Sequence, residues 1–286
     1  MTAERFRRLL VNGYLVLFFV YLFVPLAIMA AATFNQSRFP TVVPWTGFTL
    51  DWFAALWRDQ RMWDALGTSL IVAAGVIALA VPIGLAAALL LDRLHARART
   101  LVYAVMVSPL LTPGVIVGIS TLIFWRQWFG VTGGVFLTVV AQTSFIAAYA
   151  MLLFQARLER FDRTLEEAAL DLGATHLQVF RRITLPYLMP AVLSAAFIAF
   201  LQSFENYNTT LFVRGLDTTL TVYIASKVRT GLTPAVNALS LVLILLTILG
   251  AIAYELMRRR DERRKRVAAE RAGDLAAPVE PAPATS

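Results

Sequence analysis

The residue with the clearest chemical potential is Glu205, a carboxylate inside an apolar run, Tyr187–Phe212, that otherwise lacks charged side chains. Gln202 precedes it by three residues, and Asn208 and Thr209 follow by three and four, so a continuous helix would place these polar groups on one face. A carboxylate facing lipid is strongly unfavourable. This face must therefore turn towards protein or a water-filled cavity.

Two interpretations of Glu205 stay open. In the first, Glu205 pairs with a buried residue of a partner subunit, or caps a helix break, and has a structural role. In the second, it lines a polar cavity between helices and attracts a cation, to which aromatic side chains such as Tyr207 add cation–π attraction. The apolar stretches of the chain contain no Lys or Arg that could neutralise Glu205 internally, which favours the second interpretation.

The elements that must position these residues are membrane spans. Of the 286 residues, 58% are hydrophobic and 15% are charged, a composition typical of membrane proteins. A transmembrane helix needs about 20 predominantly apolar residues. We predict an all-α membrane protein with six transmembrane helices, at Gly13–Phe34, Ala65–Leu91, Leu101–Trp125, Val131–Phe154, Tyr187–Phe212 and Pro234–Met257.

The distribution of basic residues predicts the orientation of these spans. With the N-terminus inside, 19 of the 26 Lys and Arg residues fall on the cytoplasmic side. We expect a multi-pass membrane protein with both termini cytoplasmic. The net charge of +8 then reflects loops held against anionic lipid, not a nucleic-acid surface. The expected segments are a cytoplasmic N-terminus (1–12), the first span with a periplasmic loop (13–64), a transmembrane core (65–257), and a basic, then disordered, cytoplasmic tail (258–286).

Several kinds of chemistry are excluded. The chain has no cysteine, so it forms no disulfide, thiolate metal site or cysteine nucleophile. Its two lysines, Lys227 and Lys265, do not follow a glycine, as a P-loop requires, so it cannot hydrolyse ATP by that route. His95 and His176 have no second ligand at metal-binding spacing. We expect no enzyme activity, no metal and no cofactor bound by this chain.

The connection 155–186 has the pattern of two short helices. Thr164-x-x-Glu167 and Thr175-x-x-Gln178 both read as capping boxes. In the first helix, apolar residues recur at helical spacing (Leu165, Ala168, Ala169, Leu172), and polar residues take the other face (Arg163, Glu166, Glu167, Asp171). Gly173 supplies a helix stop, and Pro186 closes the second helix. Periodicity alone leaves open a helical hairpin that only closes a loop.

Particular residues of this connection resemble the EAA loop of the membrane subunits of binding-protein-dependent ABC importers. The matching positions are Glu167, Ala168, Ala169, Gly173, Ile183, Leu185 and Pro186. The resemblance covers roughly residues 60 to 260 and is closest to the spermidine/putrescine branch, among its C-type permeases. It implies a location in the bacterial inner membrane and the type I importer permease fold, in which this loop is a coupling helix that docks on a cytoplasmic ATPase.

The same resemblance implies partners and a substrate class. ATP and Mg would be held by an ATPase dimer, a second homologous permease would supply the other spans, most simply as a heterodimer, and a periplasmic binding protein would deliver the solute. Gln202, Glu205, Tyr207, Asn208 and Thr209 become pathway residues, with a polyamine as the expected passenger. Another small solute is the first alternative. A self-contained secondary carrier with Glu205 as ion relay is the second, but such a carrier needs no docking loop.

Two further expectations concern shape. Pro109 and Pro113 fall inside the third span and can kink it, either for function or only for packing. The outer segment from Phe34 to Trp63 is long and aromatic-rich, and a short interfacial helix is expected around Leu50 to Trp57.

Overall fold

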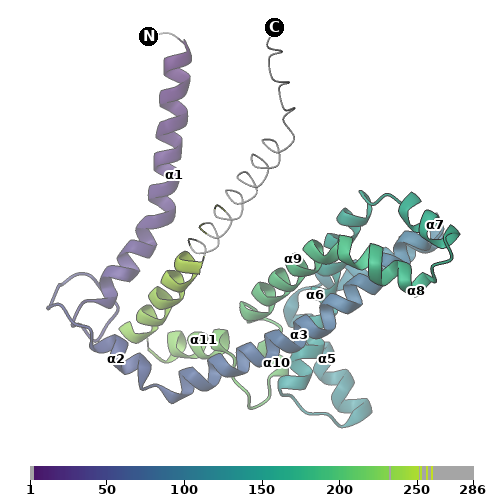
Figure 1. Cartoon of the computed structure of the whole chain (residues 1–286). Helices are drawn as coiled ribbons and strands as arrows, with labels where there is room; N and C mark the ends of the chain where they lie inside the picture. Colours follow the sequence, from purple (N-terminus) through teal and green to yellow (C-terminus); the bar gives the residue numbers. More distant parts are fainter. Residues whose placement is uncertain (1–2, 232, 251, 253–255, 257–258, 260–286) are drawn as a thin grey trace, which may run out of the picture. The chain divides into compact units, whose positions relative to one another are not determined.

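The computed structural model describes residues 3–231, 233–250, 252, 256 and 259. The chain divides into two units, Met1–Trp57 with Leu232–Ser286, and Arg58–Gly231. The described residues form helices and no β-strand, which confirms the all-α prediction (Figure 1).

The first unit contains α1 (Ala3–Thr33), α2 (Asp51–Trp57) and an apolar helix over Pro234–Gly250. The buried amide of Asn35 organises the segment between α1 and α2: its Nδ2 donates to the carbonyls of Thr41 and Pro44, at 2.8 and 3.0 Å. The α2 helix confirms the short helix expected near Trp57. The predicted tail after residue 259 lies outside the described residues.

The second unit is built on three long helices, α3 (Gln60–Arg93), α6 (Val135–Leu158) and α9 (Leu185–Phe204), which lie side by side in Figure 1. Their shared core is rich in alanine and includes Ala88, Ala150 and Ala195. A Cβ placed on Gly84 would lie 2.6 Å from the Cβ of Ala150. Small residues thus let α3 and α6 approach closely, as is common between membrane helices.

The predicted third span is two helices, α4 (Ala96–Leu111) and α5 (Gly114–Phe129), which meet at an angle of 105°. A residue before proline is disfavoured in helical geometry, and Thr112, before Pro113, is extended with ψ of 132°. The kink expected from the prolines is therefore a complete break.

The predicted fifth span is wrong over its last residues. The helix α9 ends at Phe204, and a turn leads to the short helix α10 (Thr210–Val213). The turn forms because the Asn206 carboxamide oxygen accepts hydrogen bonds from the N–H groups of Thr209 and Thr210, at 3.2 and 3.3 Å. A further helix that the hydropathy pattern did not indicate, α11, covers Leu220–Thr230.

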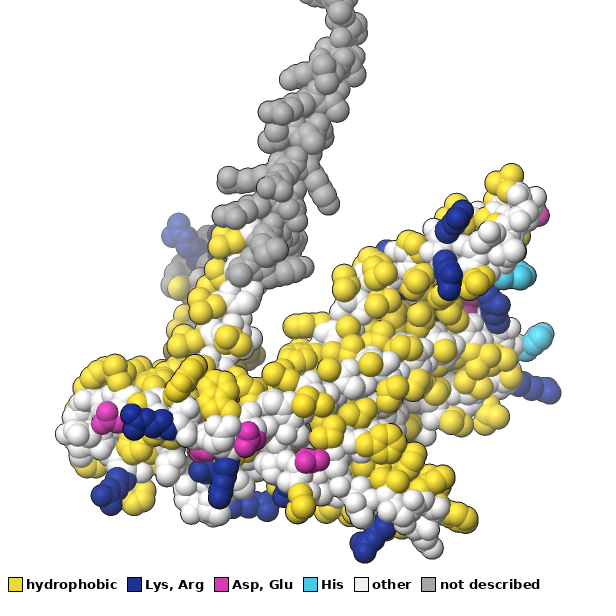
Figure 2. Space-filling view, turned by 60° about the horizontal axis from the view of Figure 1, so that its bottom comes forward, with side chains coloured by type: hydrophobic (Ala, Val, Ile, Leu, Met, Phe, Trp, Pro, Cys, Tyr) yellow, Lys and Arg dark blue, Asp and Glu magenta, His cyan; other side chains and the backbone are white. Residues whose placement is uncertain are grey.

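By length and composition, four described helices can cross a membrane, or five if α4 and α5 count as one span. These spans correspond to the first five of the six predicted transmembrane helices, although the observed helices begin and end at other residues. Of the sixth, Pro234–Met257, the described helical part is Pro234–Gly250, and several of its later residues lie outside the described residues. Apolar side chains cover much of the visible surface of the Arg58–Gly231 unit (Figure 2).

Candidate functional site

The connection between α6 and α9 forms two short helices, as predicted: α7 (Thr164–Asp171) and α8 (His176–Val179). The capping box of α8 is confirmed. The Gln178 N–H donates to Thr175 Oγ1 at 3.3 Å, and the Thr175 N–H donates to Gln178 Oε1 at 2.8 Å. A π-helical turn, η1 (Phe180–Thr184), then runs without interruption into α9.

The predicted capping box of α7 is wrong. Asp162 caps this helix instead, because its carboxylate accepts hydrogen bonds from the Thr164 hydroxyl at 2.8 Å and the Thr164 N–H at 3.0 Å. These hydrogen bonds lower the pKa of Asp162. A carboxylate two residues before the first turn thus replaces the predicted pairing of Thr164 with Glu167.

The two faces predicted for α7 differ in exposure. Leu165 and Leu172, on the apolar face, are 52% and 90% exposed, whereas Glu166, on the polar face, is half-buried and accepts a hydrogen bond from the Thr184 hydroxyl. The periodicity was read correctly, but which face points towards the rest of the chain could not be read from it. Arg and His side chains gather at the end of the unit that carries α7 and α8 (Figure 2).

The motif residues lie along this loop and into α9. Glu167 and Ala168 are exposed, and Ala169 is half-buried. Gly173 has φ of +87°, a left-handed conformation that explains the glycine after α7. The rest of the motif continues through η1 into the first turn of α9, with Ile183 and Leu185 half-buried and Pro186 exposed.

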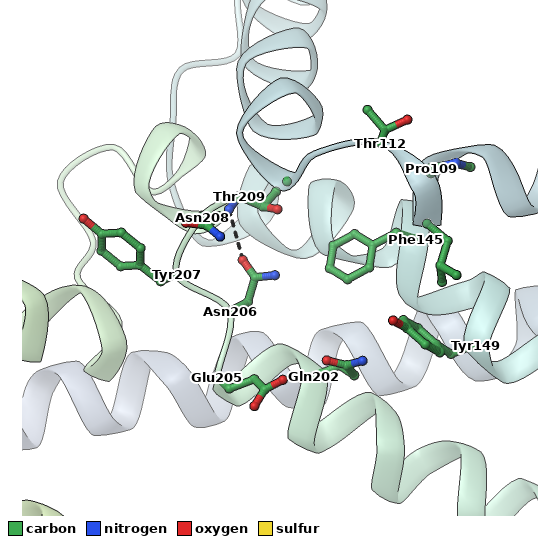
Figure 3. A pocket seen from close by; sticks show the side chains of 12 residues that line it. Pro109, Thr112, Phe145, Tyr149, Gln202, Glu205, Asn206, Tyr207, Asn208 and Thr209 are labelled. Carbon is green, nitrogen blue, oxygen red and sulfur yellow. Dashed lines mark hydrogen bonds between the residues drawn. The ribbon is translucent and has the colours of Figure 1, made fainter.

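A pocket of about 350 Å³ forms where the third and fifth predicted spans break (Figure 3). It is lined by all five predicted pathway residues, Gln202, Glu205, Tyr207, Asn208 and Thr209. They share the pocket because the chain turns after Phe204, and not because they share one face of a continuous helix. The rest of the lining consists of residues that were not predicted to line the pathway: Pro109, Leu110, Thr112, Gly114, Phe145, Tyr149 and Asn206.

A buried polar network holds the turn after α9 against α6. Gln142 of α6 is fully buried, accepts a hydrogen bond from Ser203 Oγ at 2.6 Å and donates one to Thr210 Oγ1 at 2.8 Å. Thr210 in turn donates to Asn206 Oδ1 at 3.2 Å. The network fixes both sides of the Glu205 turn. The run of polar residues from Ser203 to Thr210 was the available signal for such a break.

Glu205 is the C-cap of α9 and is exposed in the single chain. Its carboxylate has no hydrogen bond or ion pair within the described part of the chain, and it lies beside Gln202 in Figure 3. Tyr207 instead points away from Phe145 and Tyr149, and its hydroxyl accepts a hydrogen bond from Arg229 at 3.0 Å. The pocket lining contains one acidic side chain and no Lys or Arg.

Helix ends add to the electrostatics of this pocket. The C-terminal ends of α4 and α9 both reach it, at Thr112 and Glu205, and such ends carry partial negative charge. The N-terminal end of α5 reaches it at Gly114, with the opposite polarity. Thr209 is completely buried, and its hydroxyl has no partner among the described residues. The N-terminal end of α10 also reaches the pocket, at its N-cap Thr209, so two positive ends oppose two negative ends, and the Glu205 carboxylate is the one formal charge in the lining.

A second polar cluster joins the start of α3 to α11. Tyr223 donates a hydrogen bond to Asp59 Oδ2 at 2.6 Å, and Lys227 Nζ lies 3.4 Å from the same oxygen. Burial acts to raise the pKa of Asp59, but the hydrogen bonds from Tyr223 and the Met62 N–H, with the Lys227 charge, lower it overall. Burial and the Asp59 carboxylate raise the pKa of Tyr223. The cluster fixes α11 beside the start of α3.

Comparisons with known proteins agree with this arrangement. Residues 80–266 match the family described as binding-protein-dependent transport system inner membrane component. The chain is 37% identical over 260 residues to the putrescine transport system permease protein PotI of Escherichia coli K12, covering 88% of this chain and 92% of that protein. It is 31% identical over 253 residues to the spermidine/putrescine transport system permease protein PotC of the same strain, covering 88% and 95%.

A solved structure gives the same fold. A chain of a bacterial ABC transporter involved in the import of the acidic polysaccharide alginate superposes with a TM-score of 0.67 at 19% identity, over 90% of this chain and 96% of that one. The apolar helices and the matched family identify a multi-pass inner membrane protein. The chain belongs to the binding-protein-dependent transport system inner membrane components, the permease subunits of ABC importers, which work with a substrate-binding protein and a separate ATPase.

Proposed function

We propose that this permease subunit forms half of the translocation pathway of an importer for polyamines such as putrescine and spermidine. The observation that carries the proposal is the unpaired carboxylate of Glu205 in a pocket without a basic side chain. A diammonium passenger needs negative charge to replace its lost hydration. The names of the relatives PotI and PotC, which refer to putrescine and spermidine, support the same substrate class.

Within this proposal, Gln202, Asn208 and Thr209 supply polar groups around the carboxylate. The partial negative charges at the ends of α4 and α9 are offset by the N-terminal ends of α5 and α10, so the charge that attracts the passenger is that of Glu205. The rings of Phe145 and Tyr149 face the same space (Figure 3) and offer cation–π attraction. Tyr207, held by Arg229, lies at the rim, where it positions the turn that carries Glu205.

A second permease completes the pathway. One face of α9 carries an exposed apolar stripe at four-residue spacing, Met189, Leu193, Phe197 and Leu201, and Glu205 continues it by one more step. Because a carboxylate facing lipid is penalised, the end of this stripe faces protein or a water-filled cavity. We propose that a paralogue covers it in a heterodimer, as the resemblance to the polyamine branch implies. Purified complexes containing two different permeases in equal amounts would agree with this, and a single permease species would contradict it.

The α7–α8 loop is the proposed docking element for the ATPase. Its exposed leucines (Leu165, Leu172 and Leu177) offer an apolar surface, and Glu167 offers a charge-assisted hydrogen bond to a basic group. The remaining motif residues, Ala168, Ala169, Gly173, Ile183, Leu185 and Pro186, allow close approach, turn the chain and lead into α9. ATP and Mg belong to the ATPase dimer, and this chain holds no cofactor of its own.

Orientation and mechanism follow from this docking. We infer that α7 and α8 face the cytoplasm, so both termini are cytoplasmic, with segment 1–12 and the tail 258–286 on the inner side. The periplasmic loop lies within 13–64, and the transmembrane core spans 65–257. Closure of the ATPases on ATP moves the loop and opens the pathway outward, and hydrolysis resets it.

The test is uptake by the complex in liposomes, with its binding protein loaded in turn with putrescine, spermidine or an uncharged solute. Glu205→Gln removes the charge with little change in shape. Asp64→Asn is the matched control, because Asp64 is a carboxylate on α3 that does not line the pocket. We expect polyamine uptake to fall in Glu205→Gln alone. Uptake of only the uncharged solute, unaffected by Glu205→Gln, would refute the polyamine assignment.

A further inference from the structure

Two side-chain polar contacts join α7 and its N-cap residue to the rest of the chain, beside the half-buried Leu170. All eight residues of α7 are described, and none is buried. A small cavity of about 60 Å³ lies between this loop and the end of α3, and Asp92, Arg163 and Glu166 line it. The contacts that cross this region are the hydrogen bond from Thr184 to Glu166 and the ion pair of Arg163 with Asp92.

The first contact reaches the start of α9. Thr184 is 3% exposed, is the last residue of η1 and directly precedes Leu185, the first residue of α9. Its hydroxyl donates to the carboxylate of Glu166, so the hydrogen bond is charge-assisted and stronger than one between neutral groups. The π-helical geometry of η1 is rare and is often found at functional sites. A displacement of α7 is thus passed to the end of a long membrane helix.

The second contact reaches α3. The side chains of Arg163 and Asp92 are 59% and 30% exposed, and an ion pair this exposed adds little stability. A separate contact joins the end of α6 to the start of α9, where the loop begins and ends. The Arg157 guanidinium lies 4.3 Å from the Tyr187 ring centroid, and Tyr187 Oη donates to the Arg157 carbonyl at 3.2 Å. Because this contact holds α6 and α9 together, the orientation of α7 relative to α9 depends on the hydrogen bond between Thr184 and Glu166.

We propose that Glu166 is the positioning residue through which movement of α7 is transmitted to α9. When its hydrogen bond with Thr184 is present, α7 and α9 move together. When it is absent, α7 tilts into the cavity beside Asp92, and ATP hydrolysis proceeds without matching transport. This inference rests on the proposed docking of the loop on the ATPase. The exposed Glu167 docks on the ATPase, and the inward-facing Glu166 transmits the movement of α7 to α9.

The test compares Thr184→Val, which keeps the shape and removes the hydroxyl, with Thr184→Ser, which keeps the hydroxyl. The intact complex with its binding protein is reconstituted in liposomes, and putrescine uptake per ATP hydrolysed is measured together with the amount of ATPase that copurifies. Removing a hydrogen bond to a charged group changes an equilibrium by a factor of roughly 10 or more. We expect Thr184→Val to lower uptake per ATP about tenfold with the ATPase still bound, and Thr184→Ser to behave as wild type.

Glu166→Ala, at a half-exposed position, should give the same loss without changing a buried side chain. Normal uptake per ATP in Thr184→Val or in Glu166→Ala would overturn the inference. An equal fall of hydrolysis and uptake, which leaves their ratio unchanged, would also overturn it, because it would indicate a merely structural role. If the ATPase fails to copurify with the wild-type chain, the docking proposal fails, and this inference falls with it. Absence of putrescine uptake by a wild-type complex with bound, active ATPase would refute the proposed substrate instead.

Discussion

Replacing Gln142 by leucine should destabilise the protein through the polar network that holds the Glu205 turn. Gln142 is fully buried and bonds both Ser203 and Thr210. In Gln142→Leu, the buried Ser203 hydroxyl loses its acceptor, which costs about 1–3 kcal/mol, and the bond to Thr210 is lost, at about 1 kcal/mol. Thr210 keeps Asn206 as a partner, so it is not left unpaired. The expected loss of unfolding free energy is about 2–4 kcal/mol.

The measurement is reversible unfolding of the purified subunit in mixed micelles, with Gln142→Leu, Ser203→Ala and the double variant. Because Ser203→Ala removes the group that Gln142→Leu leaves unpaired, the double variant should be less destabilised than the sum of the two single variants, by about 1–2 kcal/mol. The reasoning is refuted if Gln142→Leu costs less than about 0.5 kcal/mol, or if the two effects simply add.

Three other perturbations give definite expectations. Gly84→Val should destabilise the protein by about 1–3 kcal/mol, because its Cβ would meet backbone atoms of α6 at 2.8 Å. Gly67→Ala should be neutral or stabilising, because its Cβ meets nothing within 4 Å. The same unfolding titration compares the two variants. Because the pKa of Asp59 is lowered in the folded protein, its stabilising contribution is present above the ordinary pKa of 3.8 and is lost as pH falls through the lower folded pKa. The difference in unfolding free energy between wild type and Asp59→Asn should therefore shrink over that acid range. A constant difference would contradict the assignment. Thr175→Ala should remove the cap of α8, at about 1 kcal/mol, and Thr175→Ser should retain it; hydrogen exchange of the α8 amides reports which occurs.

Hydropathy predicted the long helices well because α3, α6 and most of α9 are apolar over lengths that only a membrane or a large core accommodates. It failed after Phe204, because Leu211 and Phe212 extend the apolar run beyond the point where the Asn206 side chain ends the helix. A local hydrogen bond decided the conformation there, and average hydropathy does not register one. The α11 helix was missed for a related reason, since its eleven residues are partly polar and too few to cross a membrane.

The sequence indicated some of the residues that line the pocket but not how they come together. The five predicted pathway residues do line one pocket. Phe145 and Tyr149 line it too, but they come from a helix about 60 positions earlier in the chain, and no spacing rule connects them with Glu205. The sequence predicted two faces for α7 but not which one turns inward. The apolar face, with Leu165 and Leu172, is exposed on the single chain, so periodicity alone could not place the inward contact at Glu166.

The two helix breaks have a consequence for how such a permease changes over evolutionary time. Much of the pocket wall comes from the backbone turns at Thr112 and at 205–209, while the α3, α6 and α9 core is packed separately through alanines. Glu205 and Asn208 are exposed and take no part in the Gln142 network, so their side chains can be exchanged without altering how the long helices pack. Under the proposed function, a lineage can acquire a new solute preference by substitutions at these two positions while the helical scaffold stays unchanged.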